Sequence, residues 1–388
     1  MQAIILTAGE GARLSGWTSN RPKGMLNLGN KPILDYLVRG IIDSGISEIN
    51  MVVGYGKNSV MSYFGDGSSF NCKINYFFQD KSTGTIDALK IGMDGIRDEF
   101  ILVPGDNLVS SNAFKSLRKI KLNALLSGQA KRWSKWGEIE LVGGKAKITF
   151  DNPDAYGRIH FTGIMKINKL LALKLIELSG AHLGEALQSL GSEYPFEIVK
   201  ADYWHNIVYP WDLISGNSMA LRDNLLYKSG KIEKNVSIRG DVSIGKGTII
   251  RSGSYLHGPL SIGKNCDIGP NSVIGPSVSI GDNTTIGAFS EIVDSIIMQN
   301  CEINSFCSLK GSVVGEDNIL GSHCIAIPNN RNIRYLGQEF SVSNRGAMIG
   351  DGCRIGSRAV LEGGSILLNE ATIGEGELYN ADFQGDSI

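Results

Sequence analysis

Two glycines and two basic residues follow the first apolar stretch of the chain. Residues 2–8 read as a buried strand, and Gly9, Gly11, Arg13 and Lys23 come after it. Glycines let backbone N–H groups approach an anion closely, while arginine offers phosphate oxygens a planar fork and lysine a mobile charge. The stretch predicts a phosphate cradle. Taken alone, the same residues are equally compatible with a plain structural turn.

Two common nucleotide motifs do not fit this stretch. The Gly-Lys-Ser/Thr ending of a P-loop is absent. The third glycine and the later acidic residue of the dinucleotide-binding fingerprint do not fit either. The cradle must therefore belong to another class of phosphate site.

The first part of the chain, to about residue 225, alternates short apolar strands with amphipathic helices. The segments 48–54 and 100–106 read as strands, and 33–45 and 85–96 have apolar residues at helical spacing. This order predicts a mostly parallel sheet that is covered on both faces. Ligands bind such folds at the carboxyl ends of the strands.

From about residue 236 aliphatic residues recur every six positions. The unbroken run is Ile238, Ile244, Ile250, Leu256, Ile262, Ile268, Ile274, Ile280, Ile286 and Ile292. A fixed period of six predicts a parallel β-helix with three hexads in each triangular coil. The segment 328–347 carries no hexad, so we expect it to be extruded as a loop that is either functional or in contact with a neighbouring subunit.

Five of the six cysteines lie four residues after an aliphatic hexad position, namely Cys266, Cys301, Cys307, Cys324 and Cys353. A small, inward-facing residue normally fills this position. We therefore expect buried packing thiols rather than metal ligands or nucleophiles.

Composition excludes several classes of protein. The formal net charge of the 388 residues is −1, which predicts no nucleic-acid surface. No apolar run approaches the ~18 residues that cross a bilayer, and the first apolar stretch is too short for a signal peptide. We expect a cytoplasmic protein with no membrane partner.

The opening stretch resembles the signature of the sugar-1-phosphate nucleotidylyltransferases. That signature is G-x-G-x-R-L, then R-P-K, then K-P-I, and here it reads Gly9, Gly11, Arg13 and Leu14, then 21–23, then 31–33. The resemblance implies a Rossmann-like, mostly parallel α/β nucleotidyltransferase domain over 1–228. It further implies a left-handed parallel β-helix of hexapeptide repeats over 229–380, with the extruded loop at about 327–348.

The resemblance also implies roles for single residues. Arg13 and Lys23 are expected to be catalytic and to hold the nucleoside triphosphate and the sugar phosphate. The nucleotide-binding residues would be Leu6, Ala8, Gly9, Gly11, Gln79, Gly84 and Thr85. The last three lie in a segment that resembles the base-reading part of the family, and the plainer interpretation of that segment is a strand, a turn and a helix cap.

A magnesium site and a sugar site follow from the same resemblance. Asp106 and Asn206 match the two metal ligands, which implies Mg²⁺ as cofactor. Gly137, Asn152 and Gly163 match the sugar-binding positions. The sugar segments depart from the family pattern, because Trp136 replaces a tyrosine and Asn152 replaces a lysine.

The expected activity is formation of a nucleoside-diphosphate sugar and pyrophosphate from UTP or dTTP and glucose-1-phosphate or N-acetylglucosamine-1-phosphate. A homo-oligomer through the β-helix, with a trimer favoured, is expected as well. Two alternatives stay open: acetyl transfer by the β-helix, and a non-catalytic regulatory homologue. Ser305 stands where related acetyltransferases carry the general-base histidine, which weighs against acetyl transfer.

Overall fold

The computed structural model describes residues 1–81, 83–121, 123–129, 137–142, 145–149, 159–178, 180, 182–191, 193–223 and 226–380. The chain divides into two compact units. Unit 1 comprises 1–11, 20–26 and 32–206, and unit 2 comprises 12–19, 27–31 and 207–388. No helix within the described ranges is long and apolar enough to span a membrane.

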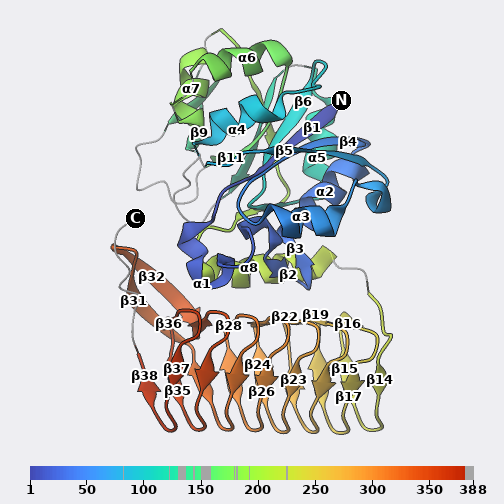
Figure 1. Ribbon diagram of the computed structural model, residues 1–388, viewed down its shortest axis with the longest axis vertical. Helices are drawn as coiled ribbons and strands as arrows, with labels where there is room; N and C mark the ends of the chain where they lie inside the picture. Colours follow the sequence, from blue (N-terminus) through green and yellow to red (C-terminus); the bar gives the residue numbers. More distant parts are fainter. Residues whose placement is uncertain are drawn as a thin grey trace. The chain divides into compact units, whose positions relative to one another are not determined.

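Unit 1 is built on a mixed sheet with the order β10-β9-β11-β6-β1-β4-β5, to which β8 and β12 are added beside β11. Figure 1 labels β9, β11, β6, β1, β4 and β5 of this sheet. Its strands are β1 Gln2–Thr7, β4 Glu48–Val53, β5 Lys73–Phe78, β6 Phe100–Pro104, β8 Ala124–Gln129, β9 Glu138–Val142, β10 Lys145–Thr149, β11 Ile159–Ile167 and β12 Glu197–Lys200. Strands β6, β1, β4 and β5 are parallel neighbours, whereas β11 runs antiparallel to β6. The predicted parallel sheet is confirmed in this central part.

Helices cover the sheet and bury its apolar strands. They are α2 Ile33–Asp43, α3 Lys57–Phe64, α4 Thr85–Gly92, α5 Ser111–Lys119, α6 Lys169–Glu177 and α7 Leu183–Leu190, with short 3₁₀ turns at η2 Lys23–Met25 and η3 Ser68–Phe70. Helix α2 packs on α5, and α4 packs on β1 and on α6. Strand β1 is enclosed, because Ala3, Ile4 and Ile5 are all fully buried.

Most of unit 2 is a parallel β-helix whose coils lie side by side in Figure 1. Its strands form three parallel sheets. The first holds β14 Lys231–Ile232, β17 Ile249–Ile250, β20 Asp267–Ile268, β23 Thr285–Ile286, β26 Glu302–Ile303, β29 Ile319–Leu320, β34 Arg354–Ile355 and β37 Thr372–Ile373. The second holds β15 Ser237–Arg239, β18 Tyr255–His257, β21 Val273–Ile274, β24 Glu291–Val293, β27 Ser308–Lys310, β30 Ile325–Ile327, β35 Val360–Glu362 and β38 Leu378–Tyr379. The third holds β16 Val242–Ile244, β19 Leu260–Ile262, β22 Val278–Ile280, β25 Ile296–Ile297, β28 Val313–Val314, β33 Met348–Ile349 and β36 Ile366–Leu367.

The six-residue period explains the core of this β-helix. Ile250 pairs with Ile268 and Ile268 with Ile286, so that the same aliphatic position stacks from coil to coil. These three side chains are fully buried. The five hexad cysteines are also buried and form no disulfide, and burial raises the pKa of the Cys301 thiol to about 12. The prediction of packing thiols is confirmed.

Helix α8, Pro210–Ala220, followed by η4 Leu221–Asp223, packs on β22, β25 and β28 of the third sheet. The amide oxygen of Asn217 accepts hydrogen bonds from Ser279 Oγ at 2.6 Å and from the N–H of Gly29 at 2.8 Å. Gly29 lies between the two-residue strands β2 Asn27–Leu28 and β3 Lys31–Pro32. Two early segments, 12–19 and 27–31, therefore belong to the same unit as the β-helix.

Residues within the hexad-free segment form an antiparallel hairpin, β31 Asn329–Tyr335 and β32 Gln338–Arg345, instead of an irregular loop. Leu336 and Gly337 make its two-residue turn, with φ of 49° and 76°. Two left-handed residues in succession match the right-handed twist of a hairpin. One face of the hairpin is apolar and buried, because Ile333, Tyr335 and Val342 are each at most 2% exposed.

The stacked aliphatic positions should dominate the stability of the β-helix. We expect Ile286→Ala to lower its free energy of unfolding by about 2–5 kcal/mol, because a cavity replaces a fully buried side chain. Thr285→Ala is the matched control, since this neighbour on β23 is exposed. Calorimetry of both variants checks the difference, and equal unfolding temperatures for the two would contradict this account of the core.

Candidate functional site

The carboxyl ends of four parallel strands meet at one edge of the unit 1 sheet. Strands β4 and β5 lie on one side of β1, and β6, which comes later in the sequence, lies on the other side of β1. The order of the strands therefore reverses between β1 and β6. Ligands of open α/β sheets bind at such a reversal, outside the carboxyl ends of the strands.

The glycine turn follows β1 at this edge. Its start is fixed by backbone hydrogen bonds, because Ala8 O accepts from Tyr55 N at 3.2 Å and Leu6 O accepts from Gly105 N at 2.8 Å. Gly11 has a φ of 72°, a conformation that favours glycine. Among the described residues other than Gly9 and its two chain neighbours, no heavy atom lies within 4 Å of the position that a Cβ on Gly9 would take. The turn therefore presents its backbone to open space, as the phosphate-cradle interpretation requires.

A third glycine, which the sequence analysis missed, supports this turn. Gly54 directly follows β4, and a Cβ there would stand 2.6 Å from Gln79 O and 2.8 Å from Ala8 O. Any side chain would force the loops after β1 and β5 apart. The sequence did contain a signal, because Gly54 ends an apolar strand just as Gly9 does.

Lys23 and Asp106 form the central ion pair of the site. The Lys23 ammonium lies 2.8 Å from Asp106 Oδ2, and both side chains are 15% exposed. Lys23 begins η2, and Asp106 lies between β6 and β7, directly before β7. Because water is largely excluded, this pair is less screened than an exposed ion pair. The structure therefore brings together a predicted catalytic residue and a predicted metal ligand.

A two-stranded antiparallel ribbon places Asn206 beside Asp106. Strand β7, Asn107–Val109, pairs with β13, Trp204–Asn206, so that Asn206 stands opposite Asn107. Asn206 Nδ2 donates to Asp106 O at 3.3 Å and to Asn107 Oδ1 at 3.1 Å. The fully buried Asn107 also accepts from Trp204 Nε1 at 2.7 Å and donates to Pro104 O at 3.1 Å. Asn107 thus organises the ribbon, a role that the sequence analysis did not assign.

The two protein oxygens fit a hard divalent cation. The Asp106 carboxylate already attracts an ammonium group, and in the parts of the chain that the structure describes no hydrogen-bond donor meets Asn206 Oδ1. No cluster of three or more His, Cys, Asp or Glu side chains suited to a metal occurs in those parts. Mg²⁺ is commonly held by one or two carboxylates together with substrate phosphates and water. The donor set is therefore compatible with Mg²⁺ and a phosphorylated ligand.

The predicted base-reading residues lie at the same edge. Gln79, 7% exposed, follows β5, and its N–H hydrogen-bonds Val53 O at 2.9 Å. Its side-chain amide approaches Thr83 Oγ1 and Gly84 O at 3.4 Å each. Gly84 has a φ of 121° and precedes Thr85, the first residue of α4. The turn between β5 and α4 is thereby held against Gln79.

Of the three predicted sugar-binding residues, one directly precedes β9 and another lies on the neighbouring strand β11. Gly137 precedes β9 and its carbonyl accepts from Phe161 N at 3.0 Å. Gly163 has a φ of 80° at an irregularity in the pairing of β11 with β8, where a side chain would be strained. Asn152 and Trp136 lie outside the described residues.

Arg13, the other predicted catalytic residue, belongs to unit 2. It lies in η1, Ala12–Leu14, two positions after Gly11 in the sequence. Its guanidinium carbon is 6.0 Å from the centroid of the Tyr209 ring, within the range of a cation–π contact. Its side chain is exposed, so the charge is available to a ligand.

Comparison with known proteins yields matches over the whole chain. Residues 2–127 match the family model described as nucleotidyl transferase, and residues 256–345 match the GMPPB C-terminal domain. The chain is 35% identical to the bifunctional protein GlmU of Methanococcus maripaludis strain C7 over 408 residues, which covers 100% of this chain and 97% of that protein. It is 29% identical over 365 residues to a bifunctional sugar-1-phosphate nucleotidylyltransferase/acetyltransferase of Sulfurisphaera tokodaii, with 91% and 88% covered.

A solved structure is similar in fold. It is that of a putative glucose-1-phosphate thymidylyltransferase from Bacillus anthracis in complex with a sucrose, at a TM-score of 0.54 and 20% identity. The match covers 59% of this chain and 98% of that chain. At this level of identity the match speaks for the fold alone.

The two glycines at the edge should respond differently to the same substitution. We expect Gly9→Ala to leave the unfolding temperature unchanged and to weaken nucleoside triphosphate binding about ten- to hundredfold, because a methyl group enters the space of a hydrogen-bonded phosphate. We expect Gly54→Ala to destabilise unit 1 by about 1–3 kcal/mol through overpacking. Calorimetry and nucleotide titration separate the two effects. Unchanged binding by Gly9→Ala would exclude the turn as the phosphate site.

Proposed function

This chain belongs to the family of the bifunctional GlmU proteins, and we propose that it is a sugar-1-phosphate nucleotidylyltransferase. It would join a nucleoside triphosphate to a sugar-1-phosphate and release pyrophosphate. The observation that carries this proposal is the Lys23–Asp106 pair beside an open glycine turn, at the strand reversal between β1 and β6. This arrangement offers a cation to the phosphates of two substrates and a carboxylate to a metal ion that binds the same phosphates.

The proposed reaction needs no protein nucleophile. A phosphate oxygen of the sugar-1-phosphate attacks the α-phosphorus in line, the bond to the β-phosphate oxygen breaks, and pyrophosphate leaves. Arg13 and Lys23 would bind the phosphate oxygens, align the attacking oxygen with the α-phosphorus, and offset the charge that develops on the leaving group. A Mg²⁺ ion on Asp106 and Asn206 would supply further positive charge against the triphosphate.

The substrates are proposed as UTP or dTTP and as glucose-1-phosphate or N-acetylglucosamine-1-phosphate. Gln79 supports the choice of a pyrimidine base, because its side-chain amide can hydrogen-bond the amide groups of uracil or thymine. The turn at Thr83 and Gly84 holds this side chain at the carboxyl ends of the strands. Gly137 and Gly163 support a close approach of the sugar, because both have a positive φ and no side chain. Leu6, Ala8 and Thr85 are proposed to complete the nucleotide site.

The proposal includes a trimer formed through the β-helix. The outward side chains of its second sheet support this assembly, because Ile325, Ile327 and Leu378 are 38%, 47% and 58% exposed. Exposed apolar side chains on one sheet favour association with another copy of that sheet.

Removing either charge should abolish most of the activity. We expect Asp106→Ala and Arg13→Ala each to lower kcat/KM at least about 100-fold, because each variant loses charge stabilisation in the transition state. Pyrophosphate release with a panel of nucleoside triphosphates and sugar-1-phosphates in Mg²⁺ is the measurement. Asp98→Ala and Arg97→Ala are matched controls, since both residues are exposed and precede β6 at the opposite edge of the sheet. Wild-type rates in Asp106→Ala and Arg13→Ala would refute the site.

Acetyl transfer is the second candidate function, because the Sulfurisphaera tokodaii relative carries it in its name. The β-helix residues weigh against it in this chain. Ser305 cannot serve as a general base at neutral pH. The nearby His323 stacks its ring on Phe306, with centroids 4.8 Å apart and an angle of 12° between the planes.

We therefore expect no acetyl transfer from acetyl-CoA to glucosamine-1-phosphate. We also expect Ser305→Ala to leave the rate of nucleotidyl transfer unchanged, because this half-buried serine belongs to a corner of the β-helix. Thiol release from acetyl-CoA is the measurement. Thiol release that depends on the sugar phosphate and disappears in Ser305→Ala would instead establish an acetyltransferase site at this corner.

A further inference from the structure

The segment that carries Arg13 is built into the β-helix unit. Residues 12–19 comprise η1, the one-turn helix α1, Ser15–Thr18, and Ser19, which follows it. The carbonyl of Gly16 accepts from Asp351 N at 3.2 Å, and Asn369 Nδ2 donates to Ser19 Oγ. A Cβ on Gly16 would stand 3.7 Å from Gly350 Cα, so the two backbones are close. Helical turns this short are not stable alone, and these contacts fix their course.

The hairpin β31–β32 supplies the anchor of Arg13 itself. The Tyr335 hydroxyl donates to Arg13 O at 2.8 Å, and the tyrosine is only 1% exposed. Burial raises the pKa of Tyr335 well above its ordinary value, so the phenol stays protonated and remains a donor. A buried donor that meets the last carbonyls of a short turn fixes the backbone from which the arginine side chain extends.

An aromatic cluster surrounds the same anchor. Tyr209 stacks on Trp211 with ring centroids 5.0 Å apart, and Phe340 from the hairpin lies 4.6 Å from Tyr209. Tyr335 meets the Trp211 ring edge-on at 5.7 Å. The cluster thus joins the start of α8 to both strands of the hairpin. It also places the Tyr209 ring 6.0 Å from the Arg13 guanidinium carbon.

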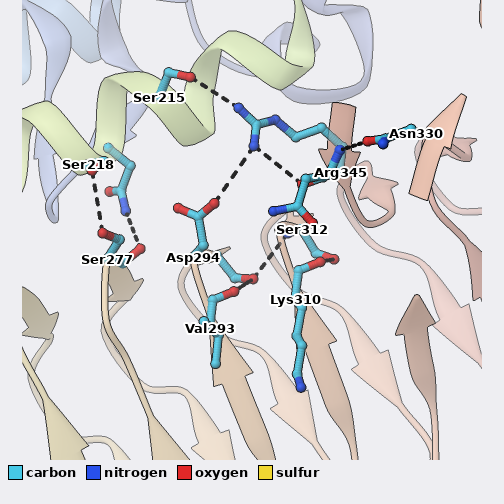
Figure 2. A network of polar contacts seen from close by, with 12 residues as sticks. Ser215, Ser218, Ser277, Val293, Asp294, Lys310, Ser312, Asn330 and Arg345 are labelled. Carbon is cyan, nitrogen blue, oxygen red and sulfur yellow. Dashed lines mark hydrogen bonds and ion pairs between the residues drawn. The ribbon is translucent and has the colours of Figure 1, made fainter. Parts of the chain in front are cut away.

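The base of the hairpin is tied to α8 and to the β-helix. Figure 2 shows Arg345 between these elements: its guanidinium donates to Ser215 Oγ on α8 at 3.2 Å and lies 3.7 Å from Asp294 Oδ2. In the middle of the hairpin, Ile333 and Val342 face Gly364, where a Cβ would meet their methyl groups at 3.0 and 3.4 Å. An isolated hairpin is marginally stable, so these contacts hold its shape.

We propose that the hairpin β31–β32 is a positioning element for nucleotidyl transfer, in which Tyr335 and the Tyr209–Phe340 cluster set the place of Arg13. This inference rests on the proposed function, because it assumes that Arg13 binds phosphate. The hairpin interrupts the run of hexads, and Tyr335 on its buried face contacts the segment of Arg13. Tyr335 is thus a positioning residue that acts through Arg13.

The test removes one hydroxyl group. We expect Tyr335→Phe to lower kcat/KM for the nucleoside triphosphate about ten- to hundredfold, since a small displacement of a phosphate-binding group is costly. The KM for the sugar-1-phosphate should stay the same. Tyr379→Phe is the matched control, because that hydroxyl donates to Ile366 O at 3.3 Å in the last coils of the same unit. We expect it to have wild-type kinetics.

A double-mutant cycle shows whether the effect passes through Arg13. In an Arg13→Ala background, Tyr335→Phe should have no further effect, because the positioned group is gone. An equal loss in both backgrounds would overturn the proposal, and so would wild-type kinetics for Tyr335→Phe. Phe340→Ala gives a second variant, with the exposed neighbour Ser341→Ala as its control, and its loss of kcat/KM should also vanish without Arg13.

The experiments distinguish a wrong function from a wrong role of the hairpin. If the unmodified chain releases no pyrophosphate with any substrate pair, the nucleotidyl transfer proposal is wrong and the inference falls with it. If the unmodified chain is active and the cycle is additive, only the role of the hairpin is wrong.

Discussion

Parallel pairing of β1 with β4 on one side and with β6 on the other is the constraint on which the site depends. In a parallel sheet all carboxyl ends lie at one edge, so segments far apart in the sequence must end together. The glycine turn after β1, Gln79 after β5 and Asp106 after β6 meet in this way. Backbone hydrogen bonds between the strand ends hold that edge before any side chain contributes.

The sequence was most informative where a physical rule repeats along it. The β-helix follows from the six-residue period, because each coil must bury the same aliphatic positions, as Ile268 and Ile286 show. The parallel sheet follows from apolar strands that alternate with amphipathic helices. Asp106 and Lys23 were singled out by resemblance to a family signature, and the ion pair between them is a finding of the structure.

Other features depend on contacts that no local pattern encodes. In the sequence Asn107 is an ordinary polar residue. Only the pairing of β7 with β13 buries it and brings Trp204 and Asn206 within hydrogen-bonding distance of its side chain. The six-residue period does not predict the hairpin, because Ile333, Tyr335 and Val342 alternate with more exposed residues at a period of two. The same alternation on both sides of Leu336 and Gly337 indicates a hairpin. It does not indicate that the Tyr335 hydroxyl donates to the carbonyl of Arg13.

The two cations that are proposed to bind the phosphates, Lys23 and Arg13, belong to different units and are anchored by different means. Lys23 is held through its side chain, by the carboxylate of Asp106. Arg13 is held through its backbone, by Tyr335, while its side chain stays exposed. A lysine that pairs with a carboxylate can exchange that partner for a phosphate. An arginine on a fixed backbone loses less conformational entropy when it binds a phosphate, so its binding position is better defined. The family signature places both residues within one short stretch, and the fold gives each of them a separate support.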